Sequence, residues 1–150
     1  EGGIIAASSL WESIMSYSVV VTESGRGRYL QDIVVNDRHR LLADEPETLG
    51  GDDAAPTPFD FLMTSLGTCT AITLRMYAER KNLAVTQISV ALDHAKVTVD
   101  GQTRDHLRRR ITIAGDLTGE QRQRMLEIAN KCPLHRALTQ PLLIASELAD

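Results

Sequence analysis

The fold depends on one segment, TPFDFLMTSLGTCTAITLRMYAERK, residues 57–81. Thr57 is a suitable capping residue, Pro58 fits the first helical position, and Asp60 places a carboxylate in the first turn. The segment therefore predicts one long apolar helix. Cys69 lies near the middle of this helix.

Composition limits the class of protein. The chain has 150 residues, of which 43% are hydrophobic and 24% charged, and its formal net charge is −4 with a pI near 5.5. These values are typical of a globular domain, and the acidic balance argues against a nucleic-acid partner. The short run Arg108–Arg110 is expected on the solvated edge of a strand. No apolar run reaches the roughly 18 residues of a membrane span, so we expect no membrane association.

The amino terminus, EGGIIAASSLWESIM, lacks the basic region and the long apolar region of a secretory signal. We therefore expect a cytoplasmic protein in a reducing compartment, where cysteines are more often catalytic, redox-sensing or inert than permanently bonded. Residues 1–14 are expected to be a vector-derived or disordered segment. Residues 15–150 are expected to form a single domain.

Several segments have the pattern of antiparallel strands. Two β-branched runs, residues 17–23 and 28–35, flank the sequence SGRG and predict a hairpin. Residues 38–43 are compatible with a short strand, and a loop rich in proline and glycine follows them up to the helix. Beyond the helix, residues 88–101 alternate in polarity and end in a turn, and residues 107–113 continue this period of two.

A second helix is predicted by the capping box that Thr118 forms with Gln121. One face of this helix is apolar and comprises Met125, Ile128, Ala129 and Cys132. Pro133 cannot continue a regular helix, so the chain is expected to turn there and to restart as a short helix in PLHRAL. LLIASEL, residues 142–148, is expected to form a last short element. The order of elements predicts an α+β fold.

The motifs of common enzymes are absent. The sequence contains no G-x-S-x-G, no P-loop, no H-E-x-x-H and no C-x-x-C. The histidines are distributed over separate elements at His39, His94, His106 and His135. We therefore expect no metal and no cofactor. His135 follows Cys132 by three residues and is a candidate base or ligand, although an exposed position is the simpler interpretation.

The two cysteines, Cys69 and Cys132, allow two interpretations. Free cysteine is often a small buried hydrophobe, whereas a reactive cysteine must be a thiolate. Counted from Pro58, Cys69 is the twelfth helical residue, beyond the first turn in which the helix dipole acts. A thiolate there needs a cation from another element, and Arg26 and Arg28 are candidates.

Two segments together resemble a known protein family. They are LADEPETLGGDDAAPTPFDFLMTSLGTCTAITLRMYAERK, residues 42–81, and LTGEQRQRMLEIANKCPLHRAL, residues 117–138. They contain a Gly-Gly loop, a helix that starts at proline, a run of small residues that ends in cysteine, and a second cysteine directly before proline. In these features the chain is similar to the OsmC/Ohr family, the osmotically inducible and organic hydroperoxide resistance proteins, and within it to the OsmC-like branch.

The resemblance implies an OsmC-like α+β fold, with antiparallel sheets and two central cysteine-bearing helices, in an intertwined homodimer whose site lies at the interface. It also implies a thiol-dependent peroxidase, an antioxidant enzyme of the stress response that acts on organic hydroperoxides. In this role Cys69 attacks a peroxide oxygen and becomes a sulfenic acid. Cys132 then resolves it into a disulfide, which a dithiol reductant reopens.

The family also places an arginine beside the attacking thiol. Counting back without gaps from Pro46 puts Arg28 at that position, whereas Arg26 better matches the local Gly-Arg-Gly context. The organic hydroperoxide resistance proteins have a glutamate directly after the helix-start proline, where this chain has Phe59 and then Asp60. Either Asp60 takes over the role of partner to the arginine, or no residue does.

The helical face of Cys69 predicts the class of substrate. At spacings of three and seven residues from Cys69, this face carries Leu62, Leu66, Ile72 and Met76. An apolar wall of this kind favours organic hydroperoxides over hydrogen peroxide. The alternatives to an enzyme are a non-catalytic redox sensor or binding module on the same fold, and an inert structural dimer.

Overall fold

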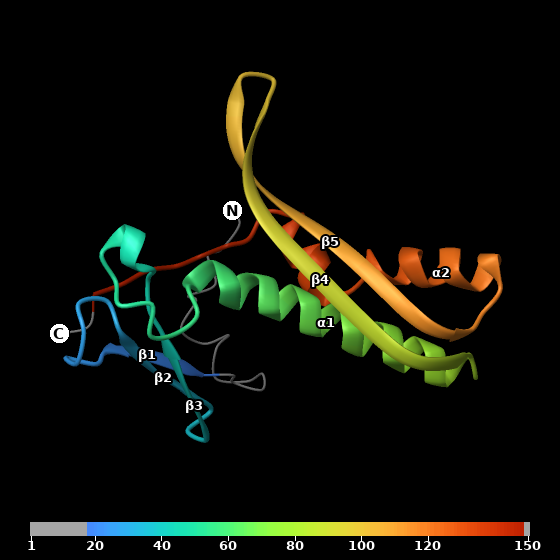
Figure 1. The fold of residues 1–150 in the computed structure, drawn as a ribbon, viewed down its shortest axis with the longest axis horizontal. Coiled ribbons are helices and arrows are strands. Elements are labelled where there is room, and N and C mark those ends of the chain that lie inside the picture. Colours follow the sequence, from blue (N-terminus) through green and yellow to red (C-terminus); the bar gives the residue numbers. More distant parts are fainter. Residues whose placement is uncertain (1–17, 149–150) are drawn as a thin grey trace, which may run out of the picture. The chain divides into compact units, whose positions relative to one another are not determined.

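The computed structural model describes residues 18–148, which belong to two compact units (Figure 1). The first unit ends at Pro58 and the second begins at Phe59. The segment expected to be vector-derived, residues 1–14, lies outside the described residues. Within residues 18–148, none of the helices has the length and the apolar character that a membrane crossing requires.

The amino-terminal unit contains a three-stranded antiparallel sheet. Its strands are β1 (Val19–Glu23), β2 (Gln31–Val35) and β3 (His39–Ala43), in that order across the sheet. The connection between β1 and β2 is residues 24–30, which is longer than the tight turn that SGRG suggested. The predicted hairpin and the short strand after it are confirmed.

The loop after β3 is organised around the buried carboxylate of Asp44. Its oxygens accept hydrogen bonds from the backbone N–H groups of Ala54 (3.1 Å), Glu45 (2.8 Å) and Asp52 (3.2 Å). The hydrogen bond from Ala54 contributes most to lowering the pKa of Asp44, because N–H donors stabilise the ionised form against the opposing effect of burial. The short helix η2 (Glu47–Leu49) lies in this loop.

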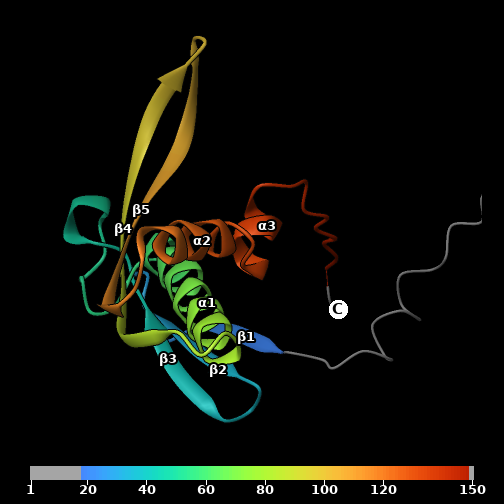
Figure 2. The same ribbon diagram turned by 90° about the vertical axis from the view of Figure 1, so that its right-hand side faces the viewer.

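The carboxyl-terminal unit combines a long two-stranded ribbon with helices. Its elements are α1 (Pro58–Arg80), β4 (Ala84–Val99), β5 (Gln102–Asp116), α2 (Gly119–Ala129) and α3 (Pro133–Leu138). Figures 1 and 2 show that one half of the ribbon lies along α1 and α2 while its tip extends past them. The tip is a two-residue turn, Asp100–Gly101, with φ of 50° and 75°, which is the backbone that a tight hairpin requires.

The core of this unit lies between α1, α2 and one face of the ribbon. Its buried members are Leu74, Ala78, Met125 and Ala129, and the ribbon residues Ile88, Ile111 and Ile113 pack against them. At Gly67 of α1, a Cβ would lie 2.9 Å from a methyl group of Leu92. The glycine therefore lets α1 approach β4 closely.

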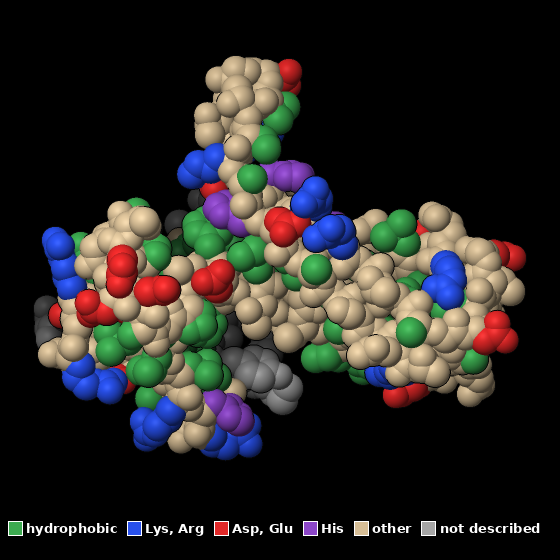
Figure 3. All heavy atoms as spheres, viewed as in Figure 1, with side chains coloured by type: hydrophobic (Ala, Val, Ile, Leu, Met, Phe, Trp, Pro, Cys, Tyr) green, Lys and Arg blue, Asp and Glu red, His purple; other side chains and the backbone are tan. Residues whose placement is uncertain are grey.

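The opposite face of the ribbon is charged. Asp93 forms an ion pair with Arg108 at 2.8 Å and lies 3.9 Å from Arg110. Figure 3 shows charged and histidine side chains gathered over the middle of the ribbon. The expected solvated position is thus confirmed for Arg108 and Arg110, but it is wrong for Arg109, because successive residues of a strand point to opposite faces.

The helices match the sequence pattern with one correction at Cys132. The helix from Pro58, the capping box of Thr118 and Gln121, and the short helix in PLHRAL are all confirmed. Cys132 is buried as expected, but it does not belong to the apolar stripe of α2, which ends at Ala129. The chain leaves α2 before Cys132, because Pro133 requires an extended residue in front of it.

The expected last element in LLIASEL is also wrong, because residues 142–148 form no helix or strand. Leu142, Leu143 and Leu148 are 60%, 98% and 99% exposed. An apolar run becomes a strand or a helix when a neighbouring element covers it, and in the described residues these side chains have no such cover.

Replacing the N-cap residue of α2 by alanine, Thr118→Ala, is expected to lower the free energy of unfolding by about 1 kcal/mol. The substitution removes the hydroxyl that accepts the N–H of Gln121 at 3.1 Å. Thr118→Ser is the matched control, since it keeps the hydroxyl. Urea denaturation followed by circular dichroism measures both variants, and equal losses of stability would contradict the role of the cap.

Candidate active site

The structure brings the two cysteines together. Cys69 is half-buried on α1, whereas Cys132 is buried at 0% exposure, and both are free thiols. The side chain of Cys69 is near enough to the Cys132 thiol to contribute to lowering its pKa. Of the two cysteines, Cys69 is the more exposed residue.

Cys132 is the N-cap of α3. Its backbone is extended, with φ of −61° and ψ of 145°, and Pro133 occupies the first helical position, for which its fixed φ is suited. The sulfur accepts a hydrogen bond from the backbone N–H of His135 at 3.3 Å. The thiol thus takes the place of the serine or threonine oxygen that usually caps a helix.

Thr70 links this thiol to α1. Its Oγ1 lies 3.8 Å from Cys132 Sγ and donates to the carbonyl of Leu66 at 2.6 Å. Thr70 follows Cys69 directly and is fully buried. The helix therefore presents a thiol and a hydroxyl to Cys132 from adjacent residues.

Arg109 reaches the same cluster from β5. Its Nη1 donates to Thr70 Oγ1 at 2.8 Å, and its Nη2 donates to Asn130 Oδ1 at 2.9 Å. Nη2 also lies 3.4 Å from Nδ1 of His135. One guanidinium group thus contacts α1, the C-cap of α2 and α3.

These contacts set the pKa of Cys132. Burial raises it, but hydrogen bonds from the His135 N–H, Thr70 and Cys69, together with the positive charge of Arg109, lower it by more. The net result is a pKa of Cys132 below its ordinary value. The surroundings of Cys132 therefore favour its thiolate more than burial alone would.

His135 is half-buried, so its interpretation as an exposed loop residue is wrong. Burial first, and the charge of Arg109 second, lower the pKa of His135, because both disfavour the imidazolium. A neutral ring can accept the Arg109 hydrogen bond at Nδ1, which puts the ring proton on Nε2. In residues 18–148, no group of three or more His, Cys, Asp or Glu side chains is arranged to hold a metal ion.

The model of one protein family, described as OsmC-like protein, matches residues 50–147 and so includes both cysteines. The chain belongs to the OsmC-like protein family. No curated protein matches the chain in sequence.

Solved structures share the OsmC-like α+β fold. The organic hydroperoxide resistance protein OsmC of Legionella pneumophila has a TM-score of 0.66 and 15% identity, covering 85% of this chain and 91% of that one. An organic hydroperoxide resistance protein of Elizabethkingia anophelis has a TM-score of 0.66 and 18% identity, covering 84% and 89%. The OsmC-like protein of Mycoplasma pneumoniae has a TM-score of 0.67 and 14% identity, covering 83% and 87%. At such identities the likeness establishes the fold.

The two arginines expected beside Cys69 lie in the amino-terminal unit of this OsmC-like chain. Arg26 forms an exposed ion pair with Asp32 at 2.6 Å, and the guanidinium of Arg28 lies 5.1 Å from the centre of the Tyr29 ring. Cys69 belongs to the other unit. The pairing of either arginine with this thiol stays a prediction.

Asp60 lies on α1, nine residues before Cys69. At 1.5 Å per residue and 3.6 residues per turn, this spacing corresponds to about 13.5 Å along the axis and to the opposite side of the helix. Asp60 lines a groove of 440 Å³ together with Gly67, Val90 and Leu92. Its role as partner of an arginine stays a prediction.

The apolar residues predicted to flank Cys69 fall into different environments. Leu66 is buried and contributes to packing. Ile72 and Met76 are 59% and 65% exposed and line a groove of 300 Å³ with Ala71, Arg75 and Ile88. An apolar surface therefore exists on α1, formed by Ile72 and Met76 and not by Leu66.

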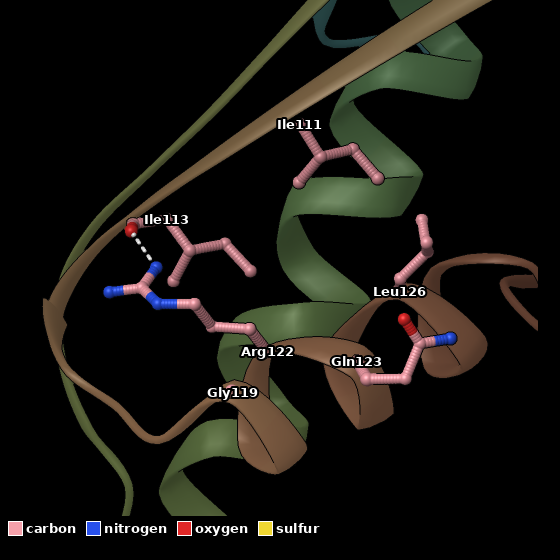
Figure 4. A pocket seen from close by; sticks show the side chains of 6 residues that line it. All are labelled: Ile111, Ile113, Gly119, Arg122, Gln123 and Leu126. Atoms are coloured by element: carbon pink, nitrogen blue, oxygen red, sulfur yellow. Dashed lines mark hydrogen bonds between the residues drawn. The ribbon is translucent and has the colours of Figure 1, made fainter.

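A further groove of 460 Å³ lies between β5 and α2 (Figure 4). Ile111, Ile113 and Leu126 form its apolar lining, and Arg122 donates to the carbonyl oxygen of Ile113 at 2.8 Å. None of the site residues expected from the sequence lines this groove.

Sequence reasoning missed Thr70, Arg109 and Asn130. A signal for Arg109 is present, because it occupies one position of the apolar period-two stripe that Leu107 and Ile111 define. A charged residue on such a stripe must find polar partners inside the fold. Thr70 and Asn130 carry no comparable signal, because their importance comes only from their contact with Arg109.

Proposed function

We propose that this OsmC-like chain is a cytoplasmic thiol-dependent peroxidase that reduces organic hydroperoxides. The observation that carries the proposal is the pair of neighbouring free thiols, Cys69 and Cys132. Their exposures suit the two roles, since a peroxide reaches half-buried Cys69 while buried Cys132 meets a sulfur that is already oxidised. The names of the Legionella and Elizabethkingia structures, organic hydroperoxide resistance proteins, support the same activity.

The reaction begins at Cys69. Its thiolate attacks the terminal oxygen of the hydroperoxide, the O–O bond breaks, and the alkoxide leaves as an alcohol after it takes a proton. The Cys132 thiolate then attacks the sulfur of the resulting sulfenic acid, so the S–S bond forms and hydroxide leaves as water. A dithiol reductant returns both cysteines to thiols by exchange and is itself oxidised to a disulfide.

The first step also needs a cation near Cys69, and we assign this role to Arg28, with Arg26 as the alternative. An opposite charge within about 4 to 6 Å favours the thiolate. Asp60 is proposed to orient this arginine in place of the family glutamate, which the chain lacks at Phe59. The arginine and the carboxylate thereby contribute to the first step, whereas Arg109 faces the second thiol.

The functional form is proposed to be a homodimer. Ile72 and Met76 leave an apolar surface on α1 that a second copy of the chain would cover. Light scattering at micromolar concentration is expected to give twice the mass of the chain, and Met76→Glu is expected to weaken the dimer, because a carboxylate would be buried without a partner. Thr86→Glu, at an exposed position of β4, is the control. A monomeric wild type would refute the proposal.

The thiol roles are tested by peroxidase turnover with tert-butyl hydroperoxide and a dithiol. Cys69→Ser is expected to abolish both sulfenic acid formation and turnover. Cys132→Ser is expected to form one sulfenic acid per chain, detected by mass after trapping, and then to stop. In the same assay, Met in place of Arg28 or Arg26 should slow the oxidation of Cys69 if that arginine supplies the charge.

Other outcomes have distinct meanings. A disulfide that forms but does not turn over with dithiol would identify a redox sensor instead of an enzyme. Neither oxidation nor turnover in the wild type would indicate an inert fold. Activity retained in Cys69→Ser would assign the attacking role to another residue.

The substrate class is tested by stopped-flow rates of Cys69 oxidation. We expect tert-butyl hydroperoxide and a fatty-acid hydroperoxide to react at least about tenfold faster than hydrogen peroxide, because burial of each methylene contributes about 0.8 kcal/mol and about 1.4 kcal/mol is a factor of ten. Because the site is expected at the dimer interface, the alkyl group is proposed to enter between the second copy of the chain and the apolar surface of Ile72 and Met76. Equal rates for the three peroxides would contradict this assignment.

A further inference from the structure

Arg109 occupies an unusual position for an arginine. It lies on the inner face of β5, opposite Leu92 of β4 and between Leu107 and Ile111 along the strand. A guanidinium on such a face is costly unless its N–H groups are hydrogen-bonded. Its neighbours in the sequence, Arg108 and Arg110, project from the other face toward Asp93.

The hydrogen-bond partners of Arg109 are all uncharged. They are the hydroxyl of Thr70, the amide oxygen of Asn130 and the neutral ring of His135. These partners satisfy N–H groups but do not neutralise the positive charge. Within this cluster, the groups that can become anions are the thiols.

Cys132 is surrounded by groups from α1, β5, α3 and the end of α2. α1 contributes Cys69 and Thr70, β5 contributes Arg109, and α3 contributes the N–H of His135. From the end of α2 comes the neutral amide of Asn130, while Lys131 is exposed. Arg109 is therefore the positive charge that faces this thiol, since His135 is neutral.

Thr70 connects the charge to the sulfur. A hydroxyl has one hydrogen to donate and two lone pairs, and Arg109 Nη1 occupies one of these lone pairs. The hydrogen can go to the Leu66 carbonyl at 2.6 Å or turn toward Cys132 Sγ at 3.8 Å. A thiolate is the stronger acceptor of the two, so ionisation of Cys132 gives the single hydroxyl hydrogen an alternative, charge-assisted acceptor.

We propose that Arg109 is the positioning residue for the resolving step: through Thr70, Asn130 and His135 it holds Cys132 as a thiolate directed at Cys69. This inference rests on the proposed peroxidase function. It adds a second arginine with a separate task, because Arg28 or Arg26 serves the attack on the peroxide while Arg109 serves disulfide formation. The step is the one already given, in which Cys132 attacks the Cys69 sulfenic acid and hydroxide leaves as water.

Stopped-flow kinetics separates the two steps, because oxidation of Cys69 depends on peroxide concentration and disulfide formation does not. Arg109→Met is expected to leave the first phase unchanged and to slow the second by about tenfold at neutral pH. The pH at which the rate of the second phase reaches half of its maximum is expected to rise by about one unit, because the thiolate loses its facing charge. Arg109→Lys, which keeps the charge but not the fork of donors, is expected to restore the midpoint but not the full rate.

Two variants serve as comparison. Arg108→Met removes the exposed neighbour of Arg109 and is expected to change neither phase. Thr70→Val replaces the hydroxyl by a methyl group of similar volume and is expected to slow the second phase in the same direction as Arg109→Met. If Arg109→Met does not fold, the lysine and valine variants decide, and an unaltered second phase in both would overturn the proposal.

A direct titration distinguishes failure of this inference from failure of the proposed function. In Cys69→Ser, the ultraviolet absorbance of the thiolate reports Cys132 alone, and adding Arg109→Met is expected to move its midpoint upward by about one pH unit. A wild type that does not react with peroxide would refute the peroxidase, while the shifted titration would still support the role of Arg109. An unchanged titration, or equal slowing of both kinetic phases, would leave Arg109 a purely structural role and overturn the inference.

Discussion

The close packing of α1 against the inner face of the β4–β5 ribbon is the constraint on which the rest of the carboxyl-terminal unit depends. Gly67 makes this approach possible, since a Cβ there would lie 2.9 Å from Leu92. One turn further on, α1 presents Cys69 and Thr70 to the residues that follow α2. A side chain at position 67 would require the Leu92 methyl group to move out of this contact.

Arg109 adds directional hydrogen bonds to this packing. The apolar core formed by Leu74, Met125 and their neighbours holds α1 and α2 together, but apolar contacts have no direction. Hydrogen bonds are directional, and the guanidinium group of Arg109 orients Thr70, Asn130 and His135 at fixed distances. A polar centre that joins one strand and three helices thereby defines the surroundings of the buried thiol.

The two thiols are in contact yet differ in environment, and this asymmetry suits a two-step redox reaction. Cys132 combines full burial, which raises its pKa, with hydrogen bonds and a facing cation, which together lower the pKa by more. Cys69 is only half-buried. In the proposed reaction, the residue that meets the peroxide is the more exposed of the two, and the residue that meets only its partner is enclosed.

The sequence by itself determined the features that follow from local rules. Pro58, the capping box of Thr118 and the Asp100–Gly101 turn mark element boundaries, because each acts on its own backbone within a few residues. The period of two contained the signal that Arg109 lies on the inner face, although Arg108–Arg110 was expected on the solvated edge, and it does not say which helix covers that face. Only the tertiary structure decided that Thr70 meets Cys132 across 62 residues, that Cys132 caps α3, and that LLIASEL stays uncovered. These are contacts between elements, and their energy depends on how the elements pack and not on the spacing of residues along the chain.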